Sequence, residues 1–130
     1  GHKMIMNLHV GWKGARAGII EKALQIIFQD RKQEISELQV AVSPMIRSCC
    51  YQVGPEFTDY FENRYIQPRE SKIYFDLPLF IKTKLIETGL SESQIEFSDE
   101  CTRCSPMNLP SFRRDKTKNR MIHAIVIKET

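Results

Sequence analysis

Long apolar runs and a strong net charge are both absent from this sequence of 130 residues. No apolar stretch approaches the ~20 residues that a membrane-spanning helix needs, and no basic-then-apolar signal segment opens the chain. We therefore expect no membrane partner and a cytoplasmic location. The net charge of +3, from 19 basic and 16 acidic residues, is too small to indicate a nucleic-acid-binding protein, so we expect no nucleic-acid partner.

Internal repeats and linkers are also absent, which favours a single domain. A composition of 42% hydrophobic and 27% charged residues is typical of a globular protein. A chain of this size can bury roughly two thirds of its surface. Gly1 and His2 resemble the remnant of an affinity tag. We assign residues 1–3 to a tag remnant and leader, and residues 4–130 to one domain.

Cysteine is scarce, with four residues in two pairs, Cys49 with Cys50 and Cys101 with Cys104. Without an export signal these thiols are expected to stay reduced. The C-x-x-C spacing of the second pair suits a tetrahedral metal, but adjacent side chains such as those of the first pair rarely reach one ion together. We therefore predict buried or pocket-lining thiols. A cysteine-dependent hydrolase with His9 or His123 as its base is an open alternative.

Hydrophobic periodicity predicts that strands and helices alternate along the chain. The predicted strands are residues 4–10, 38–42, 72–75, 95–98 and 121–127. The predicted helices are residues 15–28, 55–65 and 76–89, with a capping box from Ser91 to Gln94. The first strand is expected to be buried, and the last one is expected to be central because it is apolar on both faces. This order predicts an α+β fold, a layered mixed β-sheet with helices packed on its faces.

His9 is the most informative polar residue, because it directly precedes the sequence Val10-Gly11-Trp12-Lys13-Gly14. Two glycines let a ligand approach the backbone, Trp12 offers a stacking face and Lys13 a positive charge. This combination suits a metal or a nucleoside pocket. A hydrogen-bonded core histidine is the alternative interpretation.

Residues 101–120 form the longest stretch without periodicity, and long irregular loops are commonly functional. Within it, residues 113–120 carry five basic side chains and one acidic one, a local charge of +4. Arg113, close to Ser111 and Asp115, would be a good receptor for phosphate. A solvated charged loop is the alternative.

Four motifs together resemble the laccase-domain family, also called YfiH-like. HVGWKG, which begins at His9, resembles the family signature HAGWRG, with Lys13 in place of arginine. CCYQVG, which begins at Cys49, resembles CCYEVG. IYFDL resembles the family's DL segment, and CT at Cys101 followed by SFRRD resembles its CT and SYRRD segments. The motifs occur in family order across residues 8–127.

The resemblance implies the C-terminal portion of an enzyme that phosphorolyses purine nucleosides and deaminates adenosine, with a phenol-oxidising activity that uses copper. It implies that His9 is a ligand of zinc or copper, while the family's other two ligands lie in an upstream half without a counterpart here. We expect Lys13, Ser48, Cys49 and Arg113 to bind substrate or phosphate, and we assign no catalytic residue.

The expected partners are purine nucleosides and phosphate, together with a second copy of the chain or a complementing N-terminal segment. A different class of function is the alternative. A truncated family member would fold and act as a binding or structural protein without catalysing a reaction.

Overall fold

Short helices and short strands alternate in the computed structural model, which describes residues 3–30 and 34–127. Gly1 and His2, the predicted tag remnant, lie outside the described residues. The helical segments are α1 (Trp12–Arg16), α2 (Ile19–Gln25), η1 (Ile26–Asp30), η2 (Ile35–Glu37), α3 (Phe57–Tyr60), η3 (Asn63–Tyr65), α4 (Leu77–Glu87), η4 (Glu92–Gln94) and α5 (Phe112–Asp115). The strands are β1 (Val40–Val42), β2 (Gln52–Val53), β3 (Ile66–Arg69), β4 (Lys72–Phe75) and β5 (Ile95–Phe97). No helix in the described ranges has the length and apolar character needed to cross a bilayer.

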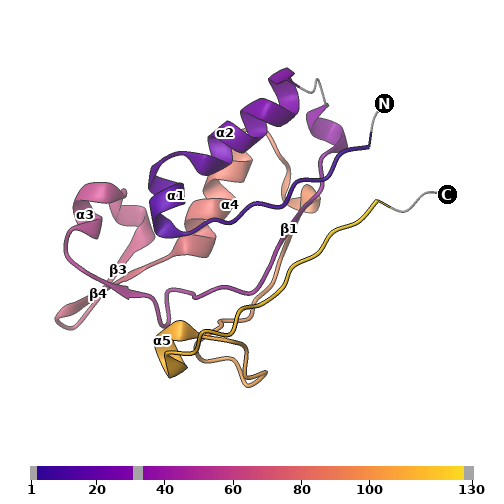
Figure 1. The fold of residues 1–130 in the computed structure, drawn as a ribbon. Helices are drawn as coiled ribbons and strands as arrows, with labels where there is room; N and C mark the ends of the chain where they lie inside the picture. Colours follow the sequence, from indigo (N-terminus) through magenta and orange to yellow (C-terminus); the bar gives the residue numbers. More distant parts are fainter. Residues whose placement is uncertain (1–2, 31–33, 128–130) are drawn as a thin grey trace.

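The strands form two small sheets of different kinds. β1 and β5 pair in parallel, with Val40 opposite Ile95 and Val42 opposite Phe97. β2, β4 and β3 form an antiparallel sheet in that order. α2 and α4 pack together beside these sheets (Figure 1). The predicted α+β class and the mixture of parallel and antiparallel pairing are confirmed.

The helix α4 and the strand β4 before it form where the sequence predicts them. Asp76 caps the helix by accepting a hydrogen bond from the backbone N–H of Leu79 at 3.0 Å, and Pro78 lies in the first turn. Gly89 follows the helix with φ of +100°, a conformation that side chains other than glycine rarely adopt. The predicted capping box from Ser91 to Gln94 is also present.

Aromatic rings fill the centre of the core. Phe75 is completely buried, and its ring centroid lies 4.3 Å from that of Phe61 and 5.4 Å from that of Phe57. Phe80 of α4 meets Phe61 edge to face at 5.3 Å. This cluster joins the antiparallel sheet to α3 and α4.

The two terminal segments do not form the strands that the sequence predicts. Residues 4–10 and 121–127 are extended without pairing in a sheet, and most of their side chains are exposed. Ile122 is 92% exposed and Val126 is 76% exposed, so the predictions of a buried first strand and a central last strand are wrong. An apolar sequence becomes a buried strand only where neighbouring strands cover it. Here the segments run along one side of the fold (Figure 1), joined by a hydrogen bond from the Asn7 side chain to the carbonyl of His123 at 3.2 Å.

The predicted helix over residues 55–65 is shorter than expected. α3 ends at Tyr60, because Phe61 is extended with φ −136° and ψ 150°. The chain then passes through η3 into β3, a strand that the sequence analysis missed. Pro68 argues against a strand, but β3 lies at the edge of its sheet, where a residue without an N–H is tolerated.

We expect Phe75→Ala to lower the free energy of unfolding by about 3–5 kcal/mol, as a large cavity at a fully buried ring does. Urea denaturation of the purified chain measures this. The matched control is Leu79→Ala, at an apolar position on α4 that is 40% exposed, where the loss should stay below about 1 kcal/mol. Equal losses in the two variants would contradict the assignment of the core.

Candidate functional site

His9 lies exposed just before α1, at the start of the motif HVGWKG. Its Nε2 atom is 3.5 Å from the position that a Cβ on Gly11 would take, so the imidazole lies over the glycine turn. The alternative interpretation of a core histidine is therefore wrong. The side chain is accessible to a ligand.

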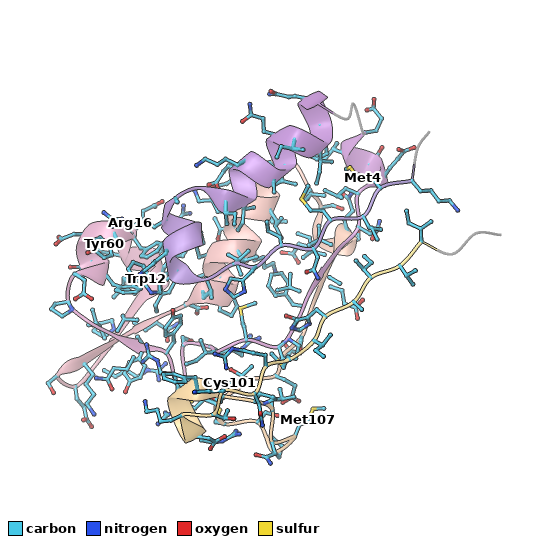
Figure 2. All side chains as sticks on the ribbon, in the orientation of Figure 1. Met4, Trp12, Arg16, Tyr60, Cys101 and Met107 are labelled. Atoms are coloured by element: carbon cyan, nitrogen blue, oxygen red, sulfur yellow. The ribbon has the colours of Figure 1, made fainter. Side chains whose placement is uncertain are left out.

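The Trp12 ring, expected to stack on a ligand, instead packs partly against aromatic side chains of the protein. Its ring is nearly parallel to that of Tyr60, with centroids 5.9 Å apart, and it contacts Phe57 at 5.2 Å. The Arg16 guanidinium lies 3.7 Å from the Tyr60 ring centroid, and Figure 2 shows these three labelled side chains together. Lys13 is exposed beside Trp12, and both residues line a shallow hollow with Arg16 and Ala17.

The four cysteines gather in one place, although they come from two distant parts of the chain. The first cysteine loop, residues 43–51, follows β1, and the second, residues 98–105, follows β5. The sulfur atoms of Cys49, Cys50, Cys101 and Cys104, here called the cysteine cluster, all lie within 4.8 Å of one another. Cys50 and Cys101 are buried, whereas Cys49 and Cys104 are exposed. The expectation that adjacent cysteines would not reach one point is wrong.

The two loops lie side by side because β1 and β5 are parallel. The chain leaves both strands at the same edge, and the pairing continues beyond them. Ser98 donates its backbone N–H to the carbonyl of Val42 at 2.9 Å. Met45 and Cys101 then form an isolated parallel bridge, in which Thr102 donates to the carbonyl of Met45 at 3.1 Å. This register places the cysteines of the two loops next to each other beyond the ends of β1 and β5.

Tight turns then point the thiols toward one another. In the first loop, the N–H groups of Cys50 and Tyr51 both donate to the carbonyl of Arg47, at 2.9 and 2.8 Å. In the second loop, Ser105 donates to the carbonyl of Cys101 at 2.9 Å. The adjacent thiols of the first loop approach the other pair because the backbone turns at that point.

Two arginines of α5 brace the cysteine loops. Arg113 donates to the carbonyl of Gln52 at 2.7 Å and lies over the Tyr51 ring, next to the first loop. Arg114 donates to the carbonyls of Thr102 and Arg103, in the second loop, and to that of Leu109 at 2.8 Å. The Asp115 carboxylate holds the Arg114 guanidinium by accepting two hydrogen bonds from Nε and one from Nη2.

Burial and hydrogen bonding move the pKa values of the clustered thiols in opposite directions. Burial opposes ionisation of Cys101, but hydrogen bonds from the backbone of Arg47, Cys104 and Arg103 prevail and lower its pKa to about 6. Burial, followed by hydrogen bonds to the other thiols, raises the pKa of Cys49. A hydrogen bond with Cys50 raises that of Cys104. Of these three thiols, Cys101 therefore becomes a thiolate most readily.

The predicted site residues divide into two groups. Lys13 lies on α1 with His9 before it, whereas Arg113 lies on α5, and Figure 1 shows these helices well apart. Ser48 and Cys49 belong to the first cysteine loop. No hydrogen bond in the described part of the chain joins His9 or His123 to a cysteine thiol, so the hydrolase alternative gains no base from this geometry.

The comparison with family models matches residues 1–128 to the model described as multi-copper polyphenol oxidoreductase laccase. The chain belongs to the multi-copper polyphenol oxidoreductase laccase family. The resemblance of its four motifs to laccase-domain proteins is thus confirmed. The family's description names copper. Among the described residues, the cysteine cluster is where four potential metal ligands lie close enough together to hold an ion.

Relatives within this laccase family carry the names of nucleoside enzymes. The chain is 39% identical over 127 residues to a purine nucleoside phosphorylase of Aquifex aeolicus, covering 98% of this chain and 58% of the relative. It is 27% identical to an adenosine deaminase of an unknown prokaryote, covering 82% and 43%. The crystal structure of YlmD from Geobacillus stearothermophilus has a TM-score of 0.75 at 27% identity, covering 83% and 43%. The chain spans about half the length of the relatives it matches.

We expect Arg114→Ala to lower the temperature of thermal unfolding more than Arg120→Ala does. Arg114 joins carbonyls of the second cysteine loop to α5, whereas Arg120 donates to the carbonyls of its near neighbours Thr117 and Asn119 and, among the described residues, to no distant group. Calorimetry of both variants and the unchanged chain measures the difference. Equal midpoints for the two variants would show that Arg114 does not brace the loop.

Proposed function

We propose that this chain is the C-terminal portion of a purine nucleoside phosphorylase that also deaminates adenosine. The observation that carries the proposal is the exposed His9 at the glycine turn of HVGWKG, in a chain that matches the laccase family throughout residues 1–128. The names of its relatives favour an enzyme over the non-catalytic alternative. We also propose a cytoplasmic location, where free thiols stay reduced.

The proposed reaction replaces the glycosidic bond at C1′ of the ribose with a bond to phosphate. A phosphate oxygen bonds to C1′ of the sugar while the bond from C1′ to the purine nitrogen breaks, and that nitrogen takes up a proton. Lys13 is the cation nearest to His9 in sequence, and its exposed ammonium group can pair with phosphate. Its role is to hold the anion beside the glycine turn, where backbone approach is unhindered.

A zinc or copper ion held in part by His9 would supply Lewis-acid or redox chemistry to the complete enzyme. The described residues do not complete such a site, because His9 belongs to no group of three His, Cys, Asp or Glu ligands among them. A single imidazole holds a catalytic metal poorly, since such sites use about three protein ligands. The remaining ligands would come from outside the described residues.

The expected roles of Ser48, Cys49 and Arg113 in binding substrate or phosphate remain predictions. One guanidinium nitrogen of Arg113 donates to the Gln52 carbonyl, and the residue is otherwise exposed. Lys13 belongs to α1 and Arg113 to α5, two helices that stand apart in Figure 1. A second copy of the chain or a complementing segment is the proposed partner of these surfaces.

A chimera tests the proposed activity. We expect the Aquifex aeolicus relative, with this chain in place of its matching 127 residues, to convert inosine and phosphate to hypoxanthine and ribose 1-phosphate. His9→Ala in the chimera should lower kcat/KM by more than about 100-fold, whereas the matched control His123→Ala should leave it unchanged. A chimera that folds yet stays inactive, or keeps full activity with His9→Ala, would contradict the proposal.

The exposed terminal segments support a proposed second copy or complementing segment as the partner. We expect the isolated chain to self-associate, because Met4, Ile5, Ile122 and Val126 expose apolar surface that association would bury. Sedimentation velocity should show a monomer after Ile122→Lys with Val126→Lys. Met107→Lys, at an apolar residue that is 64% exposed on a different loop, should leave the association intact. An isolated chain that is already monomeric would rule out the second copy.

A further inference from the structure

The sulfur spacing of the cysteine cluster fits a tetrahedral metal ion. Zinc binds thiolates at about 2.3 Å, which places the four sulfurs of a regular tetrahedron about 3.8 Å apart. The Sγ atoms of Cys49 and Cys104 are 3.7 Å apart, and no pair in the cluster exceeds 4.8 Å. A disulfide would need two sulfurs at about 2.05 Å. The cluster therefore has the dimensions of a metal cage.

Two ligands from each of two loops give the arrangement of a closed four-ligand site. Cys101 and Cys104 have the C-x-x-C spacing of zinc sites, and the turn at Arg47 directs Cys49 and Cys50 toward them. The buried thiols form the inner side of the cage and the exposed ones its outer side. An ion can therefore enter from the surface without unfolding the core.

Arginine side chains hold the two loops that carry the cluster. Arg47, Arg113 and Arg114 donate to carbonyls in or beside these loops, and Asp99 and Asp115 pair with Arg47 and Arg114. Groups that fix the positions of metal ligands strengthen metal binding.

We propose that Cys49, Cys50, Cys101 and Cys104 bind one zinc ion as a tetrathiolate site that ties the loop after β1 to the loop after β5. Each of the four thiols releases a proton when its sulfur bonds to zinc, and the ion stays divalent throughout. Four protein ligands leave no open coordination position, so this site is structural and distinct from the metal expected at His9. As a zinc ligand, Cys49 would not bind the substrate, so this proposal replaces the substrate role expected for Cys49. The ligand class is a soft divalent ion that prefers tetrahedral sulfur coordination.

Cobalt(II) is the probe, because a tetrahedral cobalt tetrathiolate has intense d–d and sulfur-to-cobalt charge-transfer absorption. We expect the reduced, metal-free chain to bind one cobalt ion with that spectrum and to lose the spectrum when one equivalent of zinc is added. The chain purified from zinc-supplemented cells should retain one zinc ion after gel filtration. His9→Ala, the matched control at the other candidate metal ligand, should retain both properties.

Serine at either exposed cysteine removes one ligand with little effect on the core. Cys49→Ser and Cys104→Ser should each weaken zinc binding by more than about 100-fold, because losing a group that merely hydrogen-bonds a metal ligand already lowers metal affinity by about 10–100-fold. Circular dichroism confirms that each variant is folded. A folded chain that binds no zinc or cobalt, an unchanged cobalt spectrum in both serine variants, an iron–sulfur chromophore, or disulfides in place of four free thiols would each overturn the proposal.

Discussion

The parallel pairing of β1 with β5 is the constraint on which the rest of this site depends. It joins segments more than fifty residues apart and makes the chain leave both strands at one edge. The bridge between Met45 and Cys101 extends the register into the loops that follow. At the other end of the pair, Gln94 donates to the carbonyls of Ile35 and Leu38, both at 2.8 Å, which fixes where β1 begins. The cysteine cluster is a consequence of this register.

A three-residue strand pair is too short to be stable by itself, so its neighbours must hold it in place. The aromatic cluster around Phe75 supplies a rigid support, because Tyr51 at the end of the first cysteine loop packs on the Phe75 ring with centroids 5.8 Å apart. From α5, Arg113 lies over the Tyr51 ring at the end of the first loop, and Arg114 donates to the carbonyl of Arg103 in the second loop. The motif SFRRD, expected from its charge to bind an anion, thus also has a structural role through its arginines.

The sequence predicted α4 and η4, which are specified by contacts within a few residues, but not the terminal segments or the cysteine cluster, which depend on distant parts of the chain. Asp76, Pro78 and Gly89 specify α4 through contacts within a few residues, and Ser91 with Gln94 does the same for η4. The strands over residues 4–10 and 121–127 were wrong because burial depends on partners elsewhere. The cysteine cluster was not predicted, because adjacent cysteines rarely reach one ion and the sequence does not reveal the parallel register that brings the two loops together. The sequence held a weak signal for the cluster, because each cysteine pair follows a predicted strand. These two strands, β1 and β5, pair with each other in the structure.

The two candidate metal ligand sets suit different tasks. His9 is a single exposed imidazole at a glycine turn, which leaves room for substrate but needs further ligands to hold an ion. The cysteine cluster offers four sulfurs and no free position, which suits an ion that holds two loops together. Because Ser48 lies in one of these loops, an ion in the cluster would set the position of a residue expected to line the substrate pocket. A stable arrangement of that pocket can therefore depend on a metal that takes no part in the reaction.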